Sequence, residues 1–294
     1  MFCLGTLGFA GLLAATTAAL AQTPIERGQY LVNSILACGN CHTPKTSNGE
    51  PILEKELSGG LVFNTPAFDA TASNITPDEE TGVGAWSDAE IKRAITQGVR
   101  PDHGRLAGVP LAAVMPVNFY KAMLPRDLDA VVAYLRSVKP VRNAVADPLY
   151  KAPVHRDAYP DAENGFTEAA LRDPFKQGAY LVTLGHCMEC HSAWQRGVSD
   201  HINGFGKGGR QFAPTLVKGF PSTWEGAKAR NITSHKTAGI GAWSDADIKR
   251  AITQGVRPDG TRLKPPMDFA SYAKMTNADL EAIVAYLRTV PSLE

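Results

Sequence analysis

An internal repeat of 19 residues constrains this chain more than any other feature of its sequence. Gly84–Asp102 reads GAWSDAEIKRAITQGVRPD, and Gly241–Asp259 reads GAWSDADIKRAITQGVRPD. The two copies differ at one position only, Glu90 against Asp247. Such self-similarity indicates that one structural unit occurs twice in the chain. A chain of 294 residues is long enough for two units of ordinary domain size.

Each copy of the repeat predicts a short helix with its own start and stop signals. In the first copy Ser87 is placed as the N-cap, and Glu90 three residues later completes a capping box. Trp86 before the cap and Ile91 inside the helix form a predicted hydrophobic staple. Gly98 supplies the C-terminal stop, because glycine adopts the left-handed conformation at little cost.

Further helices are predicted on either side of the repeat in both halves. A Gly-x-Tyr-Leu-Val segment occurs near the start of each half, at 28–32 and at 178–182. A helix with apolar residues at i, i+3, i+4 and i+7 closes each half. These residues are Leu128, Val131, Val132 and Leu135 in the first half, and Leu280, Ile283, Val284 and Leu287 in the second. No run of alternating strand residues stands out, so the predicted fold class is all-α.

A second duplicated motif carries the chemistry. Residues 38–42 read CGNCH and residues 187–191 read CMECH. On one helical turn the two cysteines share a face, so both thiols can reach the vinyl groups of one porphyrin. The histidine that follows is then placed beneath the iron. One copy alone would also fit a redox dithiol or half of a zinc site, but two copies favour two covalently attached c-type haems.

The residues predicted to hold these haems follow from the motif. The attachment residues are Cys38, Cys41, Cys187 and Cys190, and the proximal iron ligands are His42 and His191. The remaining cysteine, Cys3, lies in an apolar leader. A disulfide framework is therefore excluded in a chain that has lost this leader.

The sixth iron ligand is predicted to be a methionine in each half. Met115 and Met267 lie in proline-bearing loops after the repeated helix, where a side chain can be aimed without helical constraint. Met123 and Met275 come just before the last helix, where a methionine is more often part of the core. His103, His155, His186, His201 and His235 are predicted to be solvated or structural. With both axial positions filled, no site is left for a substrate, and the iron is restricted to electron transfer.

The ends and the middle of the chain complete the predicted organisation. Residues 1–21 are uncharged and end in Ala-Leu-Ala, which predicts a signal peptide cleaved after Ala21 and export to the periplasm. An uncleaved membrane anchor is the alternative, because the positive n-region is missing. The predicted divisions are domain 1 at 22–140, a surface linker at 141–173 and domain 2 at 174–294. The net charge of +1 gives no basis for nucleic-acid binding.

In its order of motifs the sequence resembles tandem class I cytochromes c. The shared order is the haem motif, Asn-Ile-Thr, Gly-Ala-Trp-Ser-Asp, Gly-Val-Arg-Pro-Asp, the methionine loop and Ala-Tyr-Leu, and it occurs twice. The resemblance is greatest to cytochrome c subunits of bacterial dehydrogenases for alcohols, aldehydes and sugar acids. It implies two small helical domains, each folded around one covalently bound haem, with the first and last helices crossing. Gly28 with Tyr134, and Gly178 with Tyr286, are the implied pairs at the crossings.

The resemblance also implies a function. Such a protein is expected to accept single electrons from a dehydrogenase and pass them to a cytochrome or an oxidase, and to have no catalytic residues of its own. The dehydrogenase subunits usually carry three haem motifs, whereas this sequence has two. A dihaem enzyme, either a peroxidase or a thiosulfate dehydrogenase, is the alternative. A subunit associated with the membrane through a partner or an uncleaved leader is another.

Overall fold

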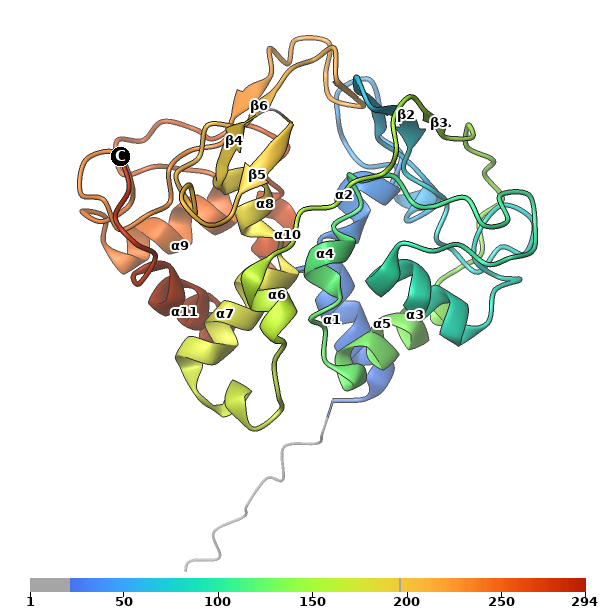
Figure 1. Ribbon diagram of the computed structural model, residues 1–294, viewed down its shortest axis with the longest axis horizontal. Coiled ribbons are helices and arrows are strands. Elements are labelled where there is room, and N and C mark those ends of the chain that lie inside the picture. Colours follow the sequence, from blue (N-terminus) through green and yellow to red (C-terminus); the bar gives the residue numbers. More distant parts are fainter. Residues whose placement is uncertain (1–21, 196) are drawn as a thin grey trace, which may run out of the picture.

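The computed structural model describes residues 22–195 and 197–294 (Figure 1). The predicted signal peptide lies outside these residues. The first half contains α1 (Pro24–Asn33), α2 (Cys38–His42), η1 (Leu53–Lys55), α3 (Asp88–Gln97), α4 (Val117–Tyr120) and α5 (Pro125–Ser137). The second contains α7 (Pro174–Leu184), α8 (Cys187–His191), α9 (Asp245–Gln254), α10 (Phe269–Tyr272) and α11 (Asn277–Leu287). The helices therefore follow the same order in both halves, which lie side by side in Figure 1.

The first and last helices of each half pack together at a glycine. A Cβ atom built on Gly28 of α1 would lie 1.9 Å from the backbone oxygen of Ala130 in α5 and 2.7 Å from Cβ of Tyr134. In the second half a Cβ on Gly178 would lie 1.9 Å from the backbone oxygen of Ala282 and 3.0 Å from Cβ of Tyr286. The predicted glycine–tyrosine crossings are confirmed.

The repeated segment forms α3 and α9 with the predicted caps. The Ser87 hydroxyl accepts from the backbone N–H of Glu90, whose carboxylate accepts from the backbone N–H of Ser87. Ser244 and Asp247 make the same capping box in the second copy. Gly98 ends α3 in the left-handed conformation, with φ at 71°.

Short strands add to the helices, so the expectation of an all-α fold is wrong in this respect. A four-stranded antiparallel sheet has the order β3-β2-β1-β7. It consists of β3 (Leu149–Tyr150), β2 (Phe68–Thr71), β1 (Val62–Asn64) and β7 (Val217–Lys218). Two further pairs are β4 (Ala193–Gln195) with β5 (Val198–Asp200), and β6 (Gln211–Phe212) with β8 (Ala227–Lys228). Strands of two to four residues are too short to produce a readable alternation of side chains.

The segment between the halves, residues 141–173, lies mostly at the surface but is anchored in the interior at one point. It includes β3, α6 (Pro160–Asn164) and η2 (Ala170–Arg172). The side chain of Tyr159 is fully buried. Its ring lies 4.6 Å from that of Phe119 in the first half and 6.1 Å from that of Phe205 in the second, measured between centroids. The segment therefore contributes to a core shared by both halves.

The halves also meet through buried polar contacts. Asp127 in α5 is fully buried and accepts two hydrogen bonds from Arg27 of α1, at 2.9 and 3.0 Å. The hydroxyl of Tyr180, in α7 of the second half, donates to the same carboxylate at 2.7 Å. Tyr30 of α1 donates to Asp279 of α11.

Among the described residues no helix is both long and apolar enough to cross a membrane.

Candidate haem-binding site

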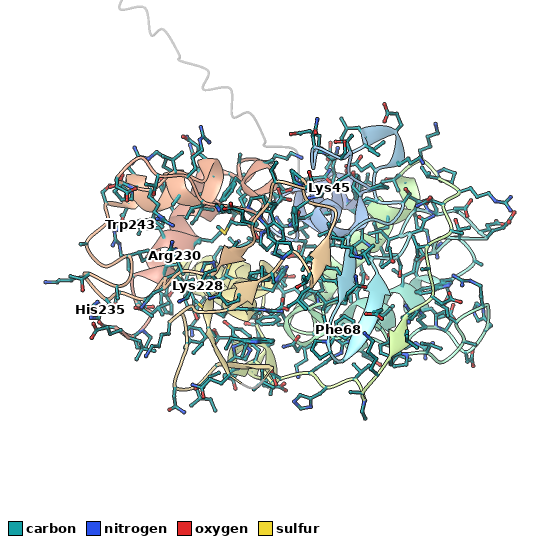
Figure 2. The ribbon with its side chains drawn as sticks, turned by 90° about the horizontal axis from the view of Figure 1, so that it is seen from above. Lys45, Phe68, Lys228, Arg230, His235 and Trp243 are labelled. Carbon is teal, nitrogen blue, oxygen red and sulfur yellow. The ribbon has the colours of Figure 1, made fainter. Side chains whose placement is uncertain are left out.

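One continuous cavity of about 1310 Å³ runs through both halves of the molecule. Its wall includes both cysteine–histidine motifs and both methionine loops. Three of the residues that line the cavity are labelled in Figure 2: Phe68 in the first half, and Arg230 and Trp243 in the second. The wall is mainly apolar, as a porphyrin-binding cavity requires.

The two motifs form one-turn helices, α2 and α8, that begin in the same unusual way. The residue before each first cysteine has a left-handed backbone conformation, with φ at 47° for Ala37 and 40° for His186. This sharp turn starts the helix directly at the cysteine. Both cysteines of each motif line the cavity, and none of the four is in a disulfide.

The thiols lie in surroundings that disfavour ionisation. Burial raises the pKa of Cys41 to about 11, and the pKa values of Cys38, Cys187 and Cys190 to about 12. A redox dithiol needs the opposite shift, because its reactive form is the thiolate. Within the described ranges, no cysteine belongs to a group of three or more candidate metal-ligating side chains. The donor set therefore fits thioether attachment better than a redox dithiol or a zinc site.

Both motif histidines are held in one tautomer by a backbone carbonyl. Nδ1 of His42 lies 2.7 Å from the carbonyl oxygen of Ser73, and Nδ1 of His191 lies 2.6 Å from that of Arg230. A carbonyl oxygen can only accept, so Nδ1 carries the proton and Nε2 keeps its lone pair. Burial lowers the pKa of both rings, which favours the neutral form that can ligate iron.

The two carbonyls that accept from the motif histidines were not predicted from the sequence, although a repeated triplet follows each of them. Ser73 and Arg230 directly precede the two Asn-Ile-Thr triplets. In the first triplet Asn74 accepts from the backbone N–H of Thr76 at 2.9 Å and donates to the carbonyl of Val141 at 2.7 Å. The second triplet does the same, with Asn231 donating to the carbonyl of Leu293 at 2.6 Å. Each asparagine thus fixes the chain next to the carbonyl that receives the histidine.

The methionines predicted as ligands and their alternatives all reach the cavity wall. Met115 and Met267 are half-buried, in loops that precede α4 and α10. Met123 and Met275 are each 6% exposed and belong to the hydrophobic core cluster. Their environments differ in the predicted direction, and the choice of iron ligand stays a prediction.

The other histidines have polar contacts of their own. His201 is buried, with its ring edge-on to those of Phe119 and Tyr159. Nε2 of His103 lies 3.0 Å from the Glu90 carboxylate, and Nδ1 of His186 lies 3.1 Å from that of Glu189. His155 is exposed beside Asp157, and His235 accepts from backbone N–H groups of its own loop.

An ion pair distinguishes the second motif from the first. Nη1 of Arg210 lies 3.3 Å from the Glu189 carboxylate, and its guanidinium covers the ring of Trp194 at 4.2 Å. Burial raises the pKa of Glu189, but His186 and Arg210 outweigh this and hold the pKa below its ordinary value. The first motif has Asn40 at the position of Glu189. Sequence reasoning missed this pair because its members are 21 residues apart.

Comparison with known proteins agrees with this geometry. Residues 175–291, which contain the second motif and α11, match the cytochrome c family. This half of the chain is therefore similar to cytochrome c domains. Proteins of this family carry haem covalently. Haem is therefore the group expected at the cysteines and histidines of the two motifs.

Relatives extend the similarity over nearly the whole chain. The chain is 28% identical to the gluconate 2-dehydrogenase cytochrome c subunit of Pantoea cypripedii, over 98% of this chain and 63% of the relative. It is 31% identical to the alcohol dehydrogenase (quinone) cytochrome c subunit of Gluconacetobacter polyoxogenes, over 95% and 59%. A diheme cytochrome c-type protein of Cereibacter sphaeroides is 26% identical, over 87% and 83%. The chain therefore resembles dehydrogenase cytochrome c subunits, but spans only 63% and 59% of the length of the first two.

Proposed function

We propose that the chain is an electron carrier with two covalently bound c-type haems, one in each half. The observation that carries this proposal is the repeated pairing of a cysteine turn with a histidine whose Nδ1 donates to a carbonyl. Each pairing leaves two thiols and one Nε2 for the same porphyrin. The bound haem iron supplies reversible one-electron chemistry.

The proposed axial ligands are His42 with Met115, and His191 with Met267. All four residues line the cavity, and the two methionines lie in loops rather than in the core. A thioether is a neutral, soft ligand that favours reduced iron relative to a second histidine. A histidine and a methionine on each iron would leave no open iron site for a substrate. We therefore propose electron transfer rather than enzymatic catalysis as the function.

Exchange of electrons between the two haems within one chain is part of this proposal. Tyr120 of the first half and Tyr272 of the second both line the shared cavity. Burial, aided by cysteines of the motifs, raises the pKa of both hydroxyls. The two halves are in contact here, because Asn40 of the first motif donates to the backbone oxygen of Pro266 in the second half at 2.9 Å. A cavity shared in this way supports transfer along the chain rather than two independent carriers.

The proposed donor is a dehydrogenase, and the proposed acceptor is a cytochrome or a terminal oxidase. The relatives named above are cytochrome c subunits of a gluconate and an alcohol dehydrogenase, which supports this choice of donor. We further propose periplasmic export with cleavage after Ala21, and domains at 22–140 and 174–294 joined by 141–173. An intact mass measured on purified protein tests the cleavage site and the number of attached haems together.

A spectroscopic redox titration tests the proposed ligation. Oxidised protein should show a methionine-to-iron charge-transfer band from both haems, and reduced protein should not bind carbon monoxide. Met115→Ala and Met267→Ala should each remove half of the band, whereas Met123→Leu and Met275→Leu should leave it unchanged. Rapid carbon monoxide binding by the unmodified protein would contradict the proposal and favour a dihaem enzyme.

The donor is tested by mixing experiments. Oxidised protein is combined with the purified catalytic subunit of a gluconate, a fructose or a quinone-linked alcohol dehydrogenase, each with its substrate. Haem reduction faster than that of an unrelated c-type cytochrome supports the proposed partner class. Equal rates for both cytochromes with all three enzymes would rule it out.

A further inference from the structure

The loop that carries Met115 is held by an arginine from outside its own half. This loop, residues 111–116, will be called the first methionine loop. Nη1 of Arg156 donates to the carbonyl oxygen of Met115 at 2.7 Å, and Nη2 donates to that of Leu111 at 2.8 Å. The same two nitrogens lie 3.5 Å from the Ala113 oxygen and 3.3 Å from the Ala112 oxygen. One guanidinium therefore contacts four carbonyl groups of the loop.

The loop needs an external donor because of its own sequence. Pro110 precedes the loop and Pro116 is its last residue, and neither has a backbone N–H. The N–H of Met115 donates to Ala112 within the loop, and that of Leu111 donates to Gly98 outside it. A guanidinium has five N–H donors in a rigid plane, which suits several carbonyls at once. Removing it would leave the carbonyl of Met115 with the N–H of Val117 as its remaining partner.

Arg156 is itself firmly placed. A Cβ atom on Gly98, at the end of α3, would lie 2.9 Å from Nη2 of Arg156, so the glycine makes room for the guanidinium. The next residue, Asp157, accepts from the backbone N–H of Ser199 in the second half at 3.1 Å. Its carbonyl accepts from Asn118, which follows the loop, at 2.7 Å. The segment carrying Arg156 is thus fixed to both halves.

The corresponding loop of the second half is held in a different way. Its carbonyls at Pro265 and Pro266 accept from Trp224 at 3.2 Å and from Asn40 at 2.9 Å. These donors are neutral, and each makes one bond. Among residues 22–195 and 197–294, a charged anchor of this kind is found only at the first methionine loop, so the two loops serve as internal controls for each other.

We propose that Arg156 is a positioning residue that holds Met115 at the iron of the first haem, an inference that rests on the proposed His/Met ligation. Its bonds are to the backbone of the loop, including the methionine's own carbonyl. Without them the loop would gain freedom, and Met115 would be held less firmly as a ligand. The second haem keeps its ligand because none of its anchoring groups is changed.

The test compares Arg156→Met with Arg142→Met in the holoprotein. Arg142 lies in the same segment, and its exposed side chain pairs with Glu80. Arg156→Met should lose up to half of the methionine-to-iron band and should bind carbon monoxide at one haem per molecule. Arg142→Met should behave like the unmodified protein. A full band without carbon monoxide binding in Arg156→Met would overturn the proposal.

Two further variants separate this outcome from misfolding and from failure of the ligation itself. Arg156→Lys keeps a cationic donor, so its band should be lost at a urea concentration between those of the unmodified protein and Arg156→Met. In both variants the band should disappear before the far-ultraviolet circular dichroism does; simultaneous loss would indicate a purely structural role and refute positioning. Met115→Ala checks the ligation independently. If it leaves the band intact, the proposed ligand is wrong, whatever Arg156 does.

Discussion

The side-chain amide of Asn40 donates a 2.9 Å hydrogen bond to the backbone oxygen of Pro266, across 226 residues of sequence. Asn40 stands between the two cysteines of the first motif, and Pro266 directly precedes Met267. Nζ of Lys45 donates to the other end of the same amide at 3.1 Å, which fixes its orientation. The first haem motif therefore holds the loop of the ligand proposed for the second haem.

Asn40→Ala should weaken the hold on Met267. A single hydrogen bond of this kind contributes about 1 kcal/mol to stability. The methionine-to-iron band of the second haem should therefore be lost at a lower urea concentration, while that of the first haem is unchanged. Asn48→Ala, at an exposed position of the following loop, serves as the control. Equal urea midpoints for Asn40→Ala and the control would show that the contact does not anchor the loop.

Gly178→Ala gives a test in which two physical effects have opposite signs. Helix propensity alone favours alanine over glycine by about 1 kcal/mol. At this crossing, however, the new Cβ would lie 1.9 Å from the backbone oxygen of Ala282. The helices must then separate, and overpacking of this kind typically costs about 1–3 kcal/mol or more. Urea unfolding should show destabilisation, and Lys176→Ala on the exposed side of α7 should not.

Asp127→Ala should be among the most destabilising single changes. It removes the carboxylate that pairs with Arg27 and accepts from Tyr180 across the two halves. Breaking a buried ion pair on one side typically costs about 3–5 kcal/mol, and a value near the lower end is expected here because the side chain of Arg27 is 22% exposed. Asp129→Ala in the same helix loses only an exposed pair with Lys92 and should cost at most about 1 kcal/mol. Similar urea midpoints for the two variants would contradict this ranking.

Acidification should destabilise the protein through His201. Burial among aromatic rings lowers the pKa of His201, although Asp157, Glu189 and Asp200 oppose the shift. The folded state then binds fewer protons than the unfolded state below the ordinary pKa of about 6.5. The contribution is complete above that value and is lost as the pH falls through the folded-state pKa. Stability measured from pH 8 to pH 5 should therefore fall less in His201→Gln than in the exposed control His155→Gln.

The parts of this protein that its sequence determined are local. The capping box of Ser87 and Glu90 involves residues three apart, and the two thiols of each motif are also three apart. The helix stripes repeat within two turns. The crossing of Gly178 with Tyr286 is not local, and it could be predicted because the resemblance to cytochromes c implied it. The caps, the cysteine spacing and the helix stripes depend on neighbours in the chain, so a linear pattern is sufficient to predict them.

The contacts that orient these local elements are visible only in the tertiary structure. The carbonyls of Ser73 and Arg230 accept from histidines 31 and 39 residues away. The Asn-Ile-Thr triplets mark these positions in the sequence but do not show which side chain the carbonyls contact. The pairing of β1 with β7 joins opposite halves through strands too short to be recognised. Arg156 reads in the sequence as one more polar residue in a linker, yet it gathers four carbonyls of the first methionine loop. Hydrogen bonds to backbone carbonyls do not require a particular side chain on the accepting residue. Only the folded chain shows which carbonyls they reach.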